Sequence, residues 1–420
     1  MNQLAILGGQ PAVQKSFQNN LSFNNREIEA AVAVAESGEW WIGKNGNPNV
    51  EKLEKTFSKF HQTKYSLAVT NGTHALEIIL SNLGIGHGDE VIIPAYGSVA
   101  TAMAVLMVGA TPILVDVHLS TMTIEPSAVK EAITPRSKAI ITVYLGGVMG
   151  EIDEILKIAK THHLFVVEDC THAHGAESNG RRAGSLGIAG AFDFQSGQMI
   201  AGGEGGMIVT RDRKLYESCW SQHNCGRRLG KSREEYYTIG TNYRMATFQA
   251  AVIQVQLERF ISQMPQRLDA IAFLDRELNQ IPGIIPQYRY PTGRSPAYRY
   301  SFRYDSQAFG GLPRDRFVAV LQAEGVPCQT SPYEPLYRLP IFQHRRFGAA
   351  GESLVHNLKG NQLPDYRDLC LPNTEYLAQT VVCLPHQVTL AEFETLSAIT
   401  IAIRKIQNNT HALLLPAVLA

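Results

Sequence analysis

A chain of 420 residues is long enough for one large domain or two ordinary ones. Lys and Arg number 38, and so do Asp and Glu, so the net charge gives no reason to expect binding to nucleic acid or to an anionic membrane. The chain is 45% apolar and 18% charged, which is typical of a compact soluble enzyme.

The N-terminus lacks the basic and long apolar regions of a secretory signal peptide, and no apolar run is long enough to span a bilayer. The six cysteines form no Cys-x-x-Cys pair, so we expect neither disulfides nor a metal site. A cytoplasmic protein is the expectation.

Short apolar runs alternate with helical periodicity over the first two thirds of the chain. The runs are β-branched and continuous, as in strands buried on both faces of a mostly parallel sheet. Strands are predicted at 90–94, 111–116, 139–143, 164–169, 191–194 and 206–210, and helices at 73–83, 99–108 and 152–161. This alternation predicts a large three-layer α/β domain.

The pattern changes near Ala246, where a long helix is predicted over 246–274. A smaller α+β region with Pro- and Tyr-rich loops follows, and a helix over 390–407 closes the chain. We therefore predict two domains, a large one over 1–262 that includes the N-terminal segment, and a smaller C-terminal one over 263–420.

Candidate site residues lie where these elements begin and end. Gly72 and Thr73 open a predicted helix, whose free N–H groups can bind a phosphate, although an ordinary helix cap explains them equally well. Asp169 ends a predicted strand, and His172 follows three residues later. Alone, each is more often structural, but together at a strand end they form a candidate site.

Several segments in order resemble the DegT/StrS-type sugar and cyclitol aminotransferases, a branch of the fold-type I enzymes that use pyridoxal phosphate (PLP). They are Leu7–Pro11, Ala68–Glu77, Gly88–Pro94, Val167–Ala176, Phe192–Gly206, Gly240–Met245 and Leu384–His386. The wording of Asn71–Glu77 is most similar to the scyllo-inosose aminotransferase branch. The resemblance implies the fold-type I architecture and a role in specialised biosynthesis.

The resemblance also implies roles for single residues. In the family, the residue at Asp169 pairs with the ring nitrogen of PLP, and the one at His172 contacts the phenolic oxygen of the ring. Gly72 and Thr73 would cradle the phosphate. Asn242 matches a position that reaches the phosphate from a partner subunit, which implies a homodimer with interface sites.

Three residues depart from the family pattern. Gln198 stands where the family has the lysine that forms the Schiff base with PLP, and an amide nitrogen cannot form an imine. Asp193 stands in place of a serine that binds the phosphate. Ser98 stands in place of an aromatic residue that stacks on the cofactor ring, a contact worth about 0.5–1.5 kcal/mol beyond its buried area.

Asp193 is the departure with the largest expected effect on a cofactor. Two like charges about 4 Å apart repel by about 4 kcal/mol at an effective dielectric constant of about 20. An ionised Asp193 facing a phosphate would therefore weaken binding by about a thousand-fold, unless it takes up a proton, turns away or gains a cation.

Three hypotheses follow. The first, which we favour from sequence alone, is an enzyme that needs no cofactor, in which Asp169, His172, Asp193 and Gln198 carry out acid–base chemistry on a small polar substrate, cationic or keto. The second is noncovalent use of pyridoxamine phosphate (PMP) or PLP on a keto-sugar or ketocyclitol. The third is a non-catalytic partner of an active paralogue.

Overall fold

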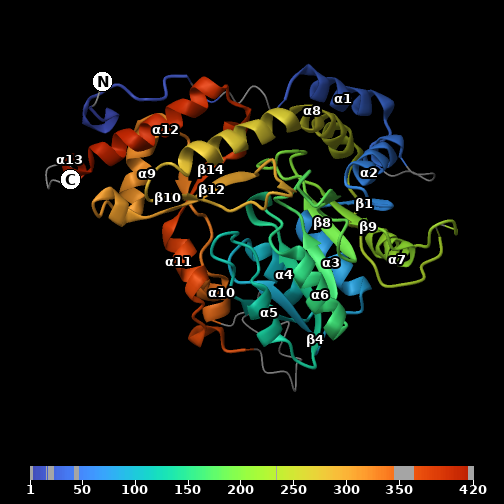
Figure 1. Ribbon diagram of the computed structural model, residues 1–420. Helices are drawn as coiled ribbons and strands as arrows, with labels where there is room; N and C mark the ends of the chain where they lie inside the picture. Colours follow the sequence, from blue (N-terminus) through green and yellow to red (C-terminus); the bar gives the residue numbers. More distant parts are fainter. Residues whose placement is uncertain are drawn as a thin grey trace.

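A seven-stranded sheet forms the larger part of the fold, seen in the computed structural model of residues 3–15, 17, 23–41, 47–232, 234–344 and 364–414 (Figure 1). In spatial order its strands are β1 (Tyr65–Val69), β9 (Gly206–Thr210), β8 (Ala189–Asp193), β5 (Phe165–Asp169), β4 (Ser137–Val143), β2 (Glu90–Pro94) and β3 (Thr111–Val115). Strand β9 pairs antiparallel with β1 and β8, and the remaining pairs are parallel. The prediction of a mostly parallel sheet is confirmed.

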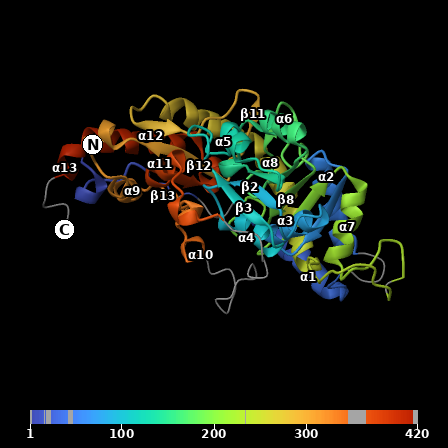
Figure 2. The ribbon, with the colours of Figure 1, turned by 90° about the horizontal axis from the view of Figure 1, so that it is seen from below.

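Helices cover both faces of this sheet (Figure 2). One face packs against α2 (Pro48–Phe60), α5 (Pro126–Ala132), α6 (Ile152–His162) and α8 (Thr247–Leu278). The other packs against α3 (Gly72–Asn82), α4 (Val99–Met107) and α7 (Arg213–His223). Successive strand residues point to opposite faces, so Ala68 of β1 joins the first core while Leu67 and Val69 join the second. The predicted three-layer α/β fold is confirmed.

A second, four-stranded antiparallel sheet lies beside the first. Its strands are β10 (Ile284–Pro286), β12 (Arg299–Tyr304), β14 (Val381–Pro385) and β13 (Gln329–Thr330). Its core includes residues of α9 (Arg314–Ala323), α12 (Phe393–Asn408) and the second half of α8. The N-terminal segment packs here too, because the Glu324 carboxylate accepts hydrogen bonds from the Ala5 and Ala12 amides.

Helix α8 joins the two parts (Figure 1). Its residues from Ile253 to Met264 belong to the core of the large sheet, and those from Ala270 to Leu278 belong to the core of the small one. This change of partner falls close to residue 263, although the division of the chain into two domains stays a prediction.

The remaining elements pack around these two sheets. Helix α1 (Asn25–Ser37) runs along α8, where the Arg259 guanidinium contacts the buried Glu27 carboxylate at 2.7 Å. The others are α10 (Pro340–Gln343), α11 (Pro372–Thr380), α13 (Thr410–Leu413) and a small sheet of β6 (Glu177–Ser178), β7 (Arg181–Arg182) and β11 (Gly293–Arg294).

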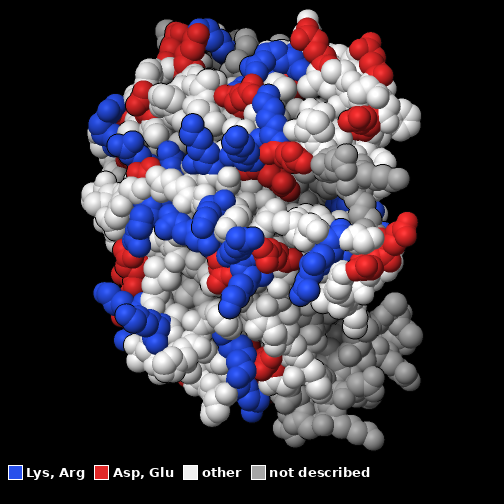
Figure 3. Space-filling model, turned by 90° about the vertical axis from the view of Figure 1, so that its right-hand side faces the viewer, with Lys and Arg blue, Asp and Glu red and all other residues white. Residues whose placement is uncertain are grey.

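Basic and acidic side chains both occur on the face shown in Figure 3, in keeping with equal numbers of each in the chain. Among the described helices, none is both long and apolar enough to cross a membrane. The described residues likewise contain no group of three or more His, Cys, Asp or Glu that could hold a metal ion.

One carboxyl of the fold titrates far from its ordinary pH. Glu54 on α2 accepts a hydrogen bond from the Ala68 amide at 2.8 Å. Burial raises the pKa of Glu54 from 4.5 to about 8, and the charge of Glu51 adds to this shift. The folded protein therefore keeps a proton that the unfolded chain loses above its own lower pKa. The free energy of unfolding consequently falls as the pH rises from 4.5 through 8.

We expect Glu54→Gln to reduce this fall by about 2 kcal/mol between about pH 5 and pH 9, because glutamine does not ionise. Urea unfolding of both proteins at a series of pH values measures the difference. Parallel pH profiles would mean that Glu54 ionises as readily in the folded protein as in the unfolded chain.

Candidate active site

Two carboxylates lie at the same edge of the large sheet. Asp169 is the last residue of β5 and Asp193 the last residue of β8, and the two strands pair in parallel. The carboxyl ends of neighbouring parallel strands are where open α/β sheets bind ligands. This edge is therefore the candidate active site.

The Asp169 carboxylate is buried and held on both sides. The Thr101 hydroxyl of α4 donates to Oδ2 at 2.6 Å, and the Thr171 hydroxyl donates to Oδ1 at 2.7 Å. Burial raises the pKa of Asp169. The two threonines fix the orientation of the carboxylate, so a ligand that approaches it meets a preset acceptor.

His172 is enclosed by aromatic side chains. Its ring stacks on Tyr298, with the centroids 4.1 Å apart, and Nε2 lies 3.2 Å from the Tyr333 hydroxyl. Burial, and secondly the charge of Arg299, lowers the pKa of His172 to about 3. The imidazole is therefore neutral near pH 7.

Asp193 lies against the N-terminus of α3. The Gly72 amide donates to its Oδ2 at 2.8 Å, and the Gln195 amide donates to Oδ1 at 2.7 Å. A Cβ at position 72 would lie 2.9 Å from the Asp193 Cβ, so this close approach requires glycine. The Asp193 carboxylate thus accepts the hydrogen bond of the Gly72 N–H group, which the family resemblance assigns to the cofactor phosphate.

Gln198 faces a different space from Asp193. With Arg267 and His386 it lines a cavity of about 90 Å³ between the loop after β8 and helix α8. Its Oε1 atom is buried and has no hydrogen-bond partner among the described residues, and the same holds for the Arg267 Nε and His386 Nδ1 atoms. We find no hydrogen bond that links Gln198 to Asp169, His172 or Asp193 in the described part of the chain.

The other predicted contacts are spread out. Thr73 is the second residue of α3 and is half-buried. The Ser98 hydroxyl caps α4 by accepting from the Ala100 amide at 3.2 Å. Asn242 is exposed and accepts from the Arg244 amide at 3.3 Å. It therefore has no contact with the sheet edge within the described single chain.

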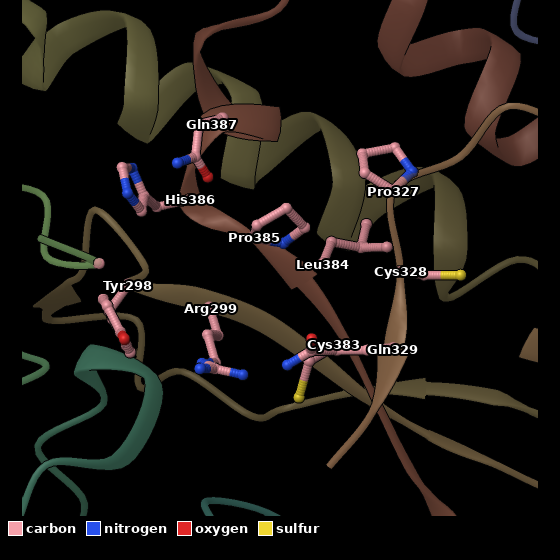
Figure 4. A pocket seen from close by; sticks show the side chains of 11 residues that line it. Tyr298, Arg299, Pro327, Cys328, Gln329, Cys383, Leu384, Pro385, His386 and Gln387 are labelled. Atoms are coloured by element: carbon pink, nitrogen blue, oxygen red, sulfur yellow. The ribbon is translucent and has the colours of Figure 1, made fainter. Parts of the chain in front are cut away.

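Two residues of the site were not predicted from sequence. Tyr298 and Arg299 line a cavity of about 300 Å³ together with Cys383, His386 and Gln329 (Figure 4). They lie at the start of β12, in a stretch rich in tyrosine. This composition is a sequence feature that could have indicated a site there.

The segment at 333–337 divides in two. Tyr333 lies beside His172, with its hydroxyl 3.2 Å from Nε2. Tyr337 is buried, donates to the Glu375 carboxylate at 2.8 Å and accepts from the Leu371 amide at 3.1 Å. Tyr337 therefore joins the segment to α11 and serves the fold.

Comparison with known proteins decides the family. A sequence model of the DegT/DnrJ/EryC1/StrS aminotransferase family matches residues 22–403. The chain belongs to this family. It is 34% identical over 375 residues to 3-amino-5-hydroxybenzoate synthase of Amycolatopsis mediterranei, covering 88% of this chain and 92% of that protein. It is 31% identical over 426 residues to L-glutamine:scyllo-inosose aminotransferase of Streptomyces griseus, covering 98% and 99%.

A solved family structure bears on the cofactor. The S. venezuelae enzyme DesV, in complex with a ketimine intermediate, is 32% identical with a TM-score of 0.77, covering 91% of this chain and 94% of that one. This family and its relatives are aminotransferases that depend on PLP. The expectation that this chain works without a cofactor is therefore wrong. The Asp193 carboxylate, expected from sequence to face a phosphate, accepts hydrogen bonds from the Gly72 and Gln195 amides.

Proposed function

We propose that this chain is a biosynthetic enzyme that acts on a keto-sugar or ketocyclitol and holds PMP without a covalent bond. The observation that carries the proposal is the preset Asp169 carboxylate at the sheet edge of an aminotransferase-family fold. Relatives named as scyllo-inosose and hydroxybenzoate enzymes support a cyclic keto substrate.

The described residues fit the ring of such a cofactor. Asp169 is a buried acceptor suited to a protonated pyridine nitrogen, and His172 and Tyr298 form an aromatic wall near it. A pyridine ring protonated in this way serves as an electron sink when bound. Gln198 provides no amine at all, so the cofactor would be held by noncovalent contacts.

The phosphate end fits less well. The Gly72 amide already donates to Asp193, and a phosphate in the same place would meet the negative carboxylate. The cradle becomes suitable once Asp193 turns away or takes up a proton. Burial raises the pKa of Asp193, which eases protonation.

The chain's own residues divide the work at this edge. Thr101 and Thr171 orient the Asp169 carboxylate. The Tyr333 hydroxyl lies 3.2 Å from His172 Nε2, and both groups stay uncharged near pH 7 because burial lowers the pKa of His172 and raises that of Tyr333. Tyr298 stacks on the His172 ring and fixes its orientation. Gln198 lines a separate cavity and, as an amide, moves no proton.

A homodimer is part of the proposal. Asn242 is exposed in the single chain, and Ile239 nearby is 98% exposed, which is unusual for an apolar side chain. A partner subunit would cover this loop and bring Asn242 toward the partner's cofactor. The mass of the protein in solution tests this assembly.

A titration tests the cofactor. Purified protein is mixed with PMP, and separately with PLP, and binding is followed by difference absorbance and by the rise in melting temperature. We expect saturable binding of PMP at millimolar concentrations or below. The absence of binding by either compound in that range would reject the proposal.

A further inference from the structure

We infer that the large cavity at the small sheet takes the carboxylate of the keto substrate, with Arg299 as its binding residue. This deepens, and rests on, the proposed function at the same site. Arg299 opens β12 and lines two cavities at once, the one of about 300 Å³ and a smaller one that His172 also lines. It therefore connects the candidate reaction site with a space large enough for a substrate.

Arg299 lacks an acidic partner. Neither cavity is lined by an aspartate or a glutamate, and Arg299 forms no ion pair with any described residue. Its partner among the described residues is the neutral Tyr298, which hydrogen-bonds it and whose ring centroid lies 5.3 Å from the guanidinium carbon. The half-buried guanidinium keeps its charge, and with no carboxylate of the described residues facing it, it can form two parallel hydrogen bonds with a bound carboxylate.

Nearby titratable groups leave Arg299 as the positive charge of the cavity. His386 lines the larger space, and burial, followed by the charges of Arg267 and Arg299, lowers its pKa to about 3. His172, on the smaller space, is neutral as well. The Tyr333 and Cys383 side chains are uncharged near neutral pH because burial raises the pKa of each.

The shape and lining of the larger cavity suit a ring with several polar substituents. About 300 Å³ is at the lower end of small-molecule sites. Gln329 and Gln387 contribute amides that can both donate and accept, as ring hydroxyl groups require. Figure 4 shows Arg299 between Tyr298 and Cys383 along one side of this space. The ligand class is thus a carboxylated cyclic polyol or its ketone.

Calorimetric titration with a matched pair of ligands tests this. Quinate is a cyclic polyol with a carboxylate, and myo-inositol is a neutral one. We expect quinate to bind more tightly than myo-inositol. Arg299→Gln should weaken quinate by about 10- to 100-fold and leave myo-inositol within about twofold, because a charge-assisted pair is lost. The affinity of Arg299→Lys for quinate should lie between those of the wild type and Arg299→Gln.

Arg303→Gln is the matched control, since Arg303 lies on the same strand and lines neither cavity within the described chain. It should change neither affinity, and melting curves of all variants check that they fold. Equal quinate affinity in wild type and Arg299→Gln would overturn the inference. The inference would also fail if Arg299→Gln left the affinity for quinate unchanged and weakened the binding of L-glutamine, but not of L-glutamine α-amide. Arg299 would then bind the carboxylate of the amino donor.

The PMP titration separates this inference from the proposed function. Binding of PMP together with unchanged quinate affinity in Arg299→Gln would refute the carboxylate site alone. An absence of PMP binding with a retained effect of Arg299 on quinate would refute the proposed function alone.

Discussion

Asp193→Ser should strengthen PMP binding by about 100-fold. The wild-type carboxylate accepts from the Gly72 amide, where the phosphate would bind, and repels it by about 4 kcal/mol at an effective dielectric constant of about 20. This energy corresponds to a loss of affinity for PMP of about a thousand-fold. We expect a smaller change, because solvent screens the charge of the partly exposed Asp193. Serine removes the charge, and its hydroxyl can donate to the phosphate. Difference absorbance titration gives both dissociation constants.

Pyridoxamine without a phosphate is the control ligand for this pair of proteins. Its affinity should change by less than about threefold, since the repulsion acts on the phosphate alone. Asp193→Asn, which keeps the shape of the side chain, should also strengthen PMP binding. Equal PMP affinity in wild type and both variants would show that the carboxylate does not compete with the phosphate.

Gln198→Lys, combined with Asp193→Ser, should convert noncovalent binding into covalent binding. Position 198 is buried beside the Arg267 guanidinium, and burial together with a neighbouring positive charge lowers the pKa of a lysine. A larger fraction of its amine is then uncharged and able to form an imine with PLP. We expect labelling of residue 198 to rise from none to nearly one pyridoxyl group per chain after borohydride reduction, as measured by peptide mass spectrometry.

Gln195→Lys in the same Asp193→Ser background is the control, because position 195 is exposed. Its labelling should stay at the level of ordinary surface lysines. If residues 195 and 198 were labelled equally, the surroundings of Gln198 would give no advantage to an amine there.

The fold was largely predictable from sequence because its signals are local. Continuous apolar runs mark strands such as Glu90–Pro94, which is buried throughout, and Phe165–Asp169, which is buried after Phe165. Strand β1 was not predicted. The antiparallel direction of β9 depends on pairing with β1 and β8, and composition does not specify it.

The roles assigned to the site residues from sequence stay predictions, and their contacts could not be predicted from sequence. Asp169 was expected at the end of a strand, and β5 does end at this residue. The hydrogen bond between Asp193 and Gly72 joins residues 121 positions apart, so no local sequence pattern predicts it. Arg299 was not predicted either. Whether a carboxylate lies close to an arginine depends on the fold, and the local sequence does not show it.

Native mass spectrometry of the protein mixed with PMP tests the central claim, a cofactor held without a covalent bond. Spectra are recorded under native conditions and again after denaturation, with a parallel sample in PLP reduced by borohydride. We predict one PMP per chain in the native spectrum and the bare chain mass after denaturation in both samples. A native spectrum without PMP, or a pyridoxyl mass that persists on a specific lysine, would contradict it.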